Sequence, residues 1–298
     1  MKLSTQTDAL AQRFGDERAI RMLAAAGFDA IDYSMFSMNA DGGVNPAHPL
    51  NGPDYREYAR HLRAVADECG VVFNQAHAPF VFRDWGDRQM YEETILPTIR
   101  RSVEAAGIMG CAVIVVHPIH HRANGTPAQL YEWNMRFYRA LIPTAEAGGV
   151  RVATENMWET DLRRHCIIDD VCSRASEFNA YIDGLNSPWI TGCLDLGHCG
   201  LVGDEAADMI RAMGPDRIGA LHVHANDYMH DSHTLPYLGK MDWNAITTAL
   251  GEIGYRGDLT FAADIFLKGM DTAFLPTAVR FLHDCGRFLI RKIDEARG

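Results

Sequence analysis

The stretch Ile218–Trp243, I-G-A-L-H-V-H-A-N-D-Y-M-H-D-S-H-T-L-P-Y-L-G-K-M-D-W, places four histidines and three aspartates directly after an apolar run typical of a buried strand. Side chains alternate along a strand, so His222 and His224 share one face, while Asp231 and His233 lie beyond the strand in a loop. This pattern suits a metal site with nitrogen and oxygen ligands. An ordinary polar loop with hydrogen-bonded histidines is the alternative, and the stretch by itself favours neither.

Strand-like and helix-like segments alternate on both sides of this stretch. The predicted strands are Lys2–Thr7, Ala30–Phe36, Val71–His77, Ala112–His117, Arg151–Asn156, Ile190–Leu196, Ile218–His224 and Leu259–Asp264. Eight strand-helix units over residues 1–298 predict a single-domain (β/α)8 TIM barrel of the α/β class. An open doubly wound sheet is the runner-up. It is disfavoured because Thr5–Asp8 stands where a glycine-rich phosphate loop would follow the first strand.

The clearest helix boundaries surround a segment in the middle of the chain. Thr126 is a candidate N-cap, Pro127 suits the first helical position, and Gln129 completes a capping box. The glycine pair Gly148–Gly149 predicts the end of that helix. We therefore expect one long helix between the fourth and fifth strands.

The composition of the chain limits which binding partners and which cellular location we expect. The formal net charge of -11 works against binding a phosphate backbone, so we expect no nucleic-acid partner. No segment approaches the length of a membrane span, and Met1–Leu10 does not resemble a secretory signal, so we expect no membrane association. The seven cysteines form no C-x-x-C pair, which favours reduced thiols and a cytoplasmic location.

The other strand ends provide an independent test of the metal interpretation, because a TIM barrel keeps its active site at the C-terminal ends of its strands. Any one polar residue there could cap a strand or pair with an arginine. Six consecutive strands, however, end in potential metal ligands, and their agreement favours a metal site. These ligands are His77, His117, Glu155, Asp195 with His198, His224 and Asp264.

Taken together, these motifs resemble the sugar phosphate isomerase/epimerase superfamily of xylose-isomerase-like TIM barrels, which includes the ketose 3-epimerases. The resemblance covers nearly the whole chain and is weak for the substrate. It rests on Glu155-Asn156, Asp195-x-x-His198, His224-x-Asn226-Asp227, Asp231-x-His233 and Leu238-Gly239-Lys240-x-Asp242-Trp243.

The resemblance implies a divalent metal, expected to be manganese, with cobalt, magnesium or zinc as alternatives. Ketose 3-epimerases hold it with Glu, Asp, His and Glu from strands five to eight, and the first three match Glu155, Asp195 and His224. Ala262 occupies the position of the last glutamate, either naturally or as an engineered change. Asp264 is then the candidate fourth ligand, through a water, or instead a substrate-binding or helix-capping residue.

The function implied is isomerisation or epimerisation of a free ketose or polyol-derived sugar by proton abstraction next to a carbonyl. Glu155 would be the base, with His198 as a second catalytic residue that contacts substrate. Because relatives are often dimers or tetramers, we expect a homodimer or homotetramer. The expected substrate-binding residues are His77, His117, Asn156, Trp158, His198, Asp231 and His233.

Two other functions stay open at this point. The superfamily also contains zinc-dependent apurinic-site endonucleases, whose ligand pattern finds matches here, although an acidic chain is a poor DNA binder. The alanine at position 262 also permits a barrel that binds a sugar without turning it over.

Overall fold

The computed structural model describes residues 1–40, 43–80, 87–120 and 125–298. Within that part of the chain, parallel strands follow one another in the predicted order. They are β1 (Leu3–Thr5), β2 (Ala30–Ser34), β5 (Val72–His77), β6 (Val113–Val115), β7 (Arg151–Glu155), β10 (Ile190–Asp195), β11 (Ile218–His222) and β12 (Leu259–Phe261).

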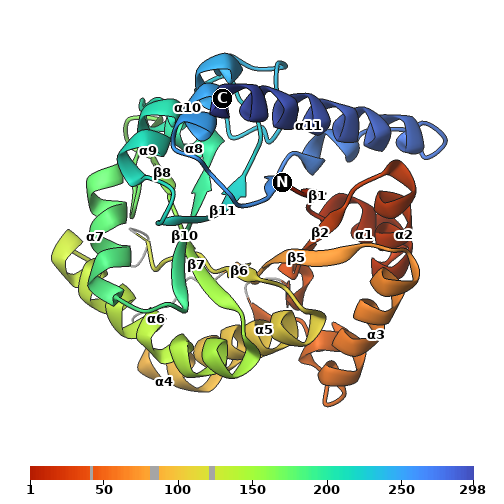
Figure 1. Cartoon of the computed structure of the whole chain (residues 1–298). Coiled ribbons are helices and arrows are strands. Elements are labelled where there is room, and N and C mark those ends of the chain that lie inside the picture. Colours follow the sequence, from red (N-terminus) through yellow and green to blue (C-terminus); the bar gives the residue numbers. More distant parts are fainter. Residues whose placement is uncertain (41–42, 81–86, 121–124) are drawn as a thin grey trace.

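These strands close into a barrel. Six of them form one parallel sheet in the order β11-β10-β7-β6-β5-β2, and β1 pairs in parallel with β12. Bridges between Gln6 and Asp32 and between Val223 and Phe261 join the two sheets on either side. Figure 1 looks into the resulting ring of strands, with helices around its outside. The predicted TIM barrel is confirmed.

Helices cover the outer surface of the barrel. The main ones are α1 (Asp8–Phe14), α2 (Asp16–Ala26), α3 (Tyr55–Glu68), α5 (Leu96–Met109), α6 (Pro127–Gly148), α7 (Ala175–Leu185), α9 (Ala206–Met213), α10 (Trp243–Glu252) and α11 (Leu275–Arg297). Two short ones are α4 (Arg88–Met90) and α8 (Leu196–Leu201). The predicted capping box is confirmed at the start of α6, where Thr126 and Gln129 exchange side-chain to backbone hydrogen bonds. Gly149 ends the helix in the left-handed conformation.

Several boundaries differ from the prediction. The last strand ends at Phe261 rather than Asp264, and the seventh ends at His222 rather than His224. The ladders stop early because the chain must bend away from the barrel to form the loops at its mouth. Two antiparallel hairpins were also not predicted: β3 (Asn39–Ala40) with β4 (Gly43–Val44), and β8 (Trp158–Asp161) with β9 (Cys166–Asp169).

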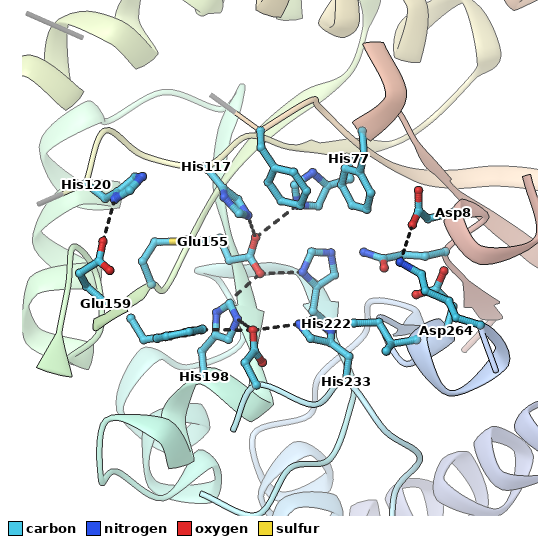
Figure 2. Close-up of a pocket in the computed structure, with 18 residues that line it drawn as sticks. Asp8, His77, His117, His120, Glu155, Glu159, His198, His222, His233 and Asp264 are labelled. Atoms are coloured by element: carbon cyan, nitrogen blue, oxygen red, sulfur yellow. Dashed lines mark hydrogen bonds and ion pairs between the residues drawn. The ribbon is translucent and has the colours of Figure 1, made fainter. Parts of the chain in front are cut away.

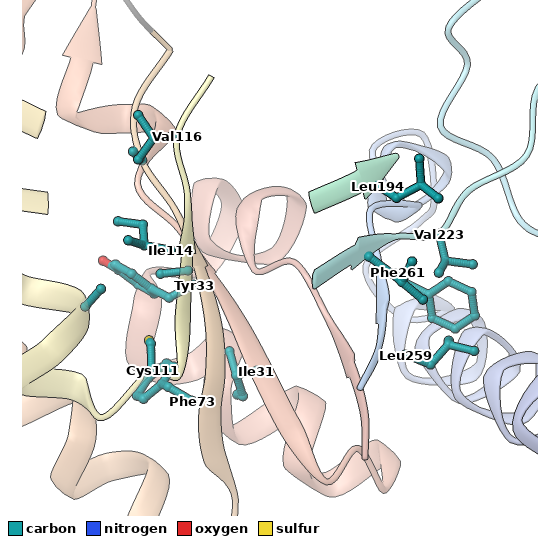
Figure 3. Packing of buried hydrophobic residues seen from close by; sticks show 14 of the residues in the cluster. Ile31, Tyr33, Phe73, Cys111, Ile114, Val116, Leu194, Val223, Leu259 and Phe261 are labelled. Atoms are coloured by element: carbon teal, nitrogen blue, oxygen red, sulfur yellow. The ribbon is translucent and has the colours of Figure 1, made fainter. Parts of the chain in front are cut away.

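The hydrophobic core has an outer and an inner part. Figure 3 shows the outer part, where residues such as Tyr33, Phe73 and Phe261 pack among the strands and helices. The inner part is a small buried cluster of Val113, Val115, Ala153, Cys193 and Ala220. Its members all come from β6, β7, β10 and β11, so one half of the barrel has an apolar floor. Across the described residues, none of the helices combines the length and apolar character needed to cross a bilayer.

Candidate metal and substrate site

Polar side chains from the C-terminal ends of the strands converge on a cavity of about 520 Å³ (Figure 2). This volume is ordinary for a small-molecule site. Its lining includes Glu155, four buried or partly buried histidines near it, and aromatic side chains at its edge. The residues that line it include Phe36, His77, Phe80, His117, Glu155, Trp158, His198, His222, Asp231, His233 and Asp264.

Glu155, the last residue of β7, lies at the centre of this arrangement (Figure 2). Its Oε1 is 2.7 Å from Nδ1 of His222, which is an N–H donor to it. Its Oε2 lies 3.0 Å from Nε2 of His117 and 3.6 Å from Nε2 of His77. Glu155 is 1% exposed, so the negative charge of its carboxylate is stabilised by these rings rather than by solvent.

Asp195 forms a second centre at the end of β10. One of its oxygens accepts the backbone N–H of His198, which caps the short helix α8, and the same oxygen lies 2.9 Å from Nε2 of His224. Its other oxygen lies 3.7 Å from Nε2 of His198. The cap fixes the carboxylate between the two imidazoles, because moving it would leave a buried N–H without an acceptor.

The loop after β11 adds a third group, above Asp195. Asp231 lies 3.2 Å from Nε2 of His233, 3.3 Å from Nε1 of Trp158 and 3.6 Å from Nε2 of His198. The ring of His233 stacks on that of His224 with centroids 3.8 Å apart. His224, just after the strand, and Asp231 and His233, in the loop that follows, therefore meet at this point.

Three histidines share one arrangement of their ring nitrogens. His77 donates its Nδ1–H to Ala78 O at 2.7 Å, His198 to Asn156 O at 2.7 Å, and His233 to Ala262 O at 2.5 Å. A carbonyl oxygen can only accept, so each Nδ1 carries a proton and each Nε2 points at a carboxylate. This is the arrangement by which a second hydrogen bond orients a metal-binding histidine.

The pKa shifts reflect dense packing of opposite charges. Burial by itself would raise the pKa of Glu155, but His222 and His117 overcome it and hold that pKa well below its usual range. Burial would lower the pKa of His198, whereas Asp195 and Asp231 raise it to about 10. Burial dominates at His117 and lowers its pKa to about 4. The carboxylates therefore stay ionised and hold a proton at His198, where a metal ion would compete with that proton.

The donor set fits a divalent metal. In the described part of the chain, close groups of ligand atoms include Glu155–Asp195–His198, His77–His117–Glu155 and His198–His224–Asp231–His233, each within 4.8 Å. Among the described residues, the buried polar atoms there that lack a hydrogen-bond partner include His224 Nδ1 and Asp231 Oδ1. Imidazole and carboxylate ligands with uncompensated lone pairs are the donors that zinc or manganese prefers.

Two of the expected site residues have other partners. Asn156 links the ends of β7 and β10, since its side-chain amide exchanges hydrogen bonds with the backbone of Asp195 at 2.9 and 2.8 Å. Asp264 accepts the backbone N–H of Ala9 at 2.8 Å, in the first turn of α1, and stands outside the groups of close ligand atoms. The structure therefore favours the helix-capping alternative for Asp264 and a structural role for Asn156.

Ala262 is fully buried and supplies no ligand, but its carbonyl accepts the N–H of His233. The residue that follows β12 thus contributes to the site through its backbone. The side chain that meets this carbonyl, His233, comes from the loop after β11.

Sequence reasoning missed the role of His222. It donates to Glu155 from beneath and stacks on His77, with ring centroids 5.4 Å apart. Its alternation with His224 along the strand was the available signal, because both had to face the barrel interior. His120, Glu159 and Asp170, at the edge of the cavity, form a further close group that no motif indicated.

Comparison with known proteins agrees with this architecture. Solved structures similar to the chain include a D-tagatose 3-epimerase-like protein (TM-score 0.74, 18% identity, all of both chains covered) and a D-psicose 3-epimerase in the presence of D-fructose (TM-score 0.72, 19% identity, all of both chains covered). The 3-keto-D-glucoside 4-epimerase YcjR from E. coli has a TM-score of 0.71 and 19% identity, with 97% of this chain and 99% of that chain covered. At these identities the likeness establishes the fold.

Sequence relatives are also detectable. The uncharacterized protein y4fM of Sinorhizobium fredii is 26% identical over 81% of this chain and 68% of its own length. The uncharacterized protein ML2432 of Mycobacterium leprae is 23% identical over 81% of each. The sequence profile of the xylose isomerase-like TIM barrel matches residues 20–264. The chain belongs to the xylose isomerase-like TIM barrel family.

Proposed function

We propose that this protein is a divalent-metal-dependent isomerase or epimerase that moves a proton next to the carbonyl of a free ketose or polyol-derived sugar. The observation that carries the proposal is the convergence of buried carboxylates and imidazoles, in which Glu155, Asp195 and His198 bring ligand atoms within 4.8 Å of one another and His224 lies 2.9 Å from Asp195. Solved structures of the same fold include enzymes described as ketose 3-epimerases, which supports the class of reaction.

Glu155, Asp195 and His224 would hold the metal, with His198 as a close neighbour. Asp195 lies 2.9 Å from His224, and Glu155 belongs with Asp195 and His198 to one group of ligand atoms within 4.8 Å. When bound, the metal supplies Lewis-acid stabilisation of negative charge on the sugar's carbonyl oxygen. We expect manganese, and cobalt, magnesium or zinc are the alternatives to compare.

Glu155 is the proposed base. It faces the cavity from the end of β7, and the surrounding histidines hold its pKa well below the usual range, so its carboxylate is ionised, which is the form that a general base requires. General-base assistance of this kind contributes about 10²- to 10⁴-fold in rate. His77, His117 and His222 hold the carboxylate in place, while His198, at the same cavity, is the proposed second catalytic residue.

The shape and charge of the cavity favour an uncharged sugar. Phe36 and Phe80 stack with centroids 4.4 Å apart and form an apolar wall suited to the C–H face of a sugar ring or chain. Among the described residues that line the cavity, Lys268 is the one lysine or arginine, and its Nζ lies 3.3 Å from Asp8. Trp158, Asp231 and His233 also line the cavity and are the proposed hydroxyl-binding residues.

Isomerisation fits the site better than two-base epimerisation. Epimerisation needs a second acid on the opposite face of the carbon, and Ala262 cannot supply one. An aldose-ketose exchange needs one base that returns the proton on the same face. Glu155 is the proposed base for that transfer.

The direct test is proton exchange in D2O. The protein, stripped of metal and reloaded in turn with manganese, cobalt, magnesium or zinc, is incubated with pentoses, hexoses and inososes, and deuterium incorporation is followed by NMR. We expect exchange into at least one ketose that depends on the metal and disappears in Glu155→Gln. Metal-loaded, folded protein that exchanges none of these sugars would contradict the proposal.

A zinc-dependent phosphodiesterase is the second candidate, since the groups His77–His117–Glu155 and His198–His224–Asp231–His233 could hold more than one ion. Metal analysis separates the two functions. One ion per chain and intact abasic DNA support the isomerase, whereas two or three zinc ions and DNA incision support the nuclease. Tight sugar binding with neither activity would indicate a non-catalytic barrel.

A further inference from the structure

Asp32, in the middle of β2, is a buried carboxylate to which the proposed function assigns no role. Its neighbours Ile31 and Tyr33 belong to the outer core, so strand alternation turns Asp32 toward the barrel interior. Gln75 donates to its Oδ2 at 3.1 Å, whereas its Oδ1 has no hydrogen-bond partner within the described part of the chain. A carboxylate in such a place has lost its hydration, so a nearby proton-bearing group must compensate.

His222, on β11, is the group that faces Asp32. Its Nδ1–H donates to Oε1 of Glu155 at 2.7 Å (Figure 2), and its Nε2 lies 3.8 Å from Oδ2 of Asp32. The ring stacks on His77 with centroids 5.4 Å apart and planes 10° from parallel, which holds the plane of the imidazole. In this orientation each ring nitrogen faces a carboxylate. Turning the ring over would place ring carbons there instead.

The contact between Asp32 and His222 crosses the barrel interior. Strands β2 and β11 are the two end strands of the six-stranded sheet, and β1 and β12 lie between them on the other side of the ring. Charges interact much more strongly in a buried interior than in water. Asp32 can therefore orient the imidazole at ion-pair distance, as the buried carboxylate of a Ser-His-Asp triad orients its histidine.

We propose that Asp32 is a positioning residue for Glu155, and that it acts through His222 to hold Oε1 of the Glu155 carboxylate from the barrel interior and leave Oε2 for the substrate. The inference rests on the proposed role of Glu155 as the base. Because His222 engages Oε1, Oε2 is the oxygen that takes the proton from the sugar. It lies 3.0 Å from Nε2 of His117, which lines the cavity.

The position of Asp32 separates this role from substrate binding. His222 and Glu155 line the cavity, whereas Asp32 lies deeper in the barrel, outside the described lining. A substitution at Asp32 should therefore change the orientation of the base without removing a contact to the sugar. A small misplacement of a reacting group slows the chemical step, so the effect belongs in kcat rather than in KM.

The first test is the kinetics of sugar exchange in D2O. We expect Asp32→Asn to lower kcat by about 10- to 100-fold and to leave KM unchanged, which is the usual cost of removing the partner that orients a site histidine. Asp29→Asn is the matched control, with the same chemical change just before the same strand. Asp29 accepts from the backbone of Leu3 and from Arg287, away from the site, so we expect its variant to keep the full kcat. Thermal melts establish that both variants fold, and Asp32→Ser, which removes the charge with less bulk, replaces Asp32→Asn if that variant does not.

The second test does not depend on activity. In metal-free protein labelled with 15N-histidine, the hydrogen-bonded Nδ1–H of His222 should give a slowly exchanging downfield proton signal, assigned by its loss in His222→Gln. We expect this signal to shift in Asp32→Asn and in Glu155→Gln, and to stay in place in Asp29→Asn.

The outcomes separate this inference from the proposed function. A folded, metal-loaded wild type that exchanges no sugar would contradict the proposed function and the inference with it. A wild type that exchanges sugar, while Asp32→Asn keeps either the full kcat or the wild-type signal of His222, would overturn the role of Asp32 alone.

Discussion

The two halves of the barrel mouth are built differently. At the ends of β7 and β10 and just after β11, side chains face one another, with Glu155, Asp195 and His224 as the principal members. Strand β12 is followed directly by Ala262, whose carbonyl accepts from His233, and nearby Asp264 accepts a hydrogen bond from the first turn of α1. One half supplies candidate ligands, and the other supplies backbone support.

The barrel interior beneath the two halves differs as well. Under the ligand half lies the apolar cluster that includes Val113 and Ala153. Under the other half, Ser4 donates to Thr260 at 2.9 Å, and Gln75 donates to buried Asp32 at 3.1 Å. Charged groups above an apolar floor keep a low-dielectric environment, which strengthens their interactions. The candidate metal ligands are therefore concentrated on one side of the mouth.

The largest expected effect comes from removing the central carboxylate of the ligand half. Glu155→Gln keeps the shape but cannot take up a proton as a base, so we expect sugar exchange to fall by about 10²- to 10⁴-fold. Exchange rates in D2O measure this loss. Glu146→Gln, on the exposed surface of α6, is the control with the same chemical change. Equal rates for Glu155→Gln and the wild type would remove Glu155 from the reaction.

Metal binding should stabilise the ligand half of the mouth. At a metal concentration about 1,000 times the dissociation constant, binding raises the free energy of unfolding by about 4 kcal/mol. We expect a higher melting temperature with manganese than with EDTA, and no such difference in His224→Ala. His61→Ala removes a half-exposed surface histidine and should keep the full metal effect. Equal melting temperatures of the wild type in manganese and in EDTA would contradict the proposed metal site.

The pH dependence of stability tests the environment of Asp264, in the half of the mouth next to β12. Burial raises its pKa from 3.8 to about 6, so between these values the folded state binds more protons than the unfolded state. Stability therefore falls as pH rises from about 4 to about 6, and the loss is complete above that range. We expect Asp264→Asn to flatten this dependence and to be more stable at pH 7 by about 2 kcal/mol. Urea unfolding in EDTA measures the pH dependence and the stability at pH 7. If the free energy of unfolding changes with pH in the same way in Asp264→Asn and in the wild type, Asp264 does not have the raised pKa.

Restoring a ligand to the supporting half should have the smallest effect. Ala262→Glu adds a carboxylate beside His233, and we expect manganese to bind about tenfold more tightly, or about 1.4 kcal/mol. Isothermal titration measures the change. Ala262→Gln has the same size without the charge and should give little gain. If the glutamate variant binds metal no better, the site already has a complete set of ligands without β12.

Much of the fold was predictable from local signals. The alternation of strand-length apolar runs with helical segments predicted the barrel. Thr126 and Gln129 predicted the start of α6, because a capping box depends on residues three apart. The ends of β11 and β12 were less predictable, since the chain leaves the ladder where loop packing requires it. The hairpin of β8 and β9 also went unrecognised, because its residues lack a clear alternating pattern.

The sequence by itself determined the barrel and the kinds of residue at its mouth, because strand alternation and strand order depend on local pattern and chain direction. Only the tertiary structure decided which of these residues meet. It joined Asp231 and His233 to Asp195 and His224, brought His222 beneath Glu155, and turned Asp264 toward α1. The sequence could not settle these roles because a few ångströms and the direction of one ring nitrogen distinguish a metal ligand from a helix cap. Those quantities are set by contacts between residues far apart in the chain.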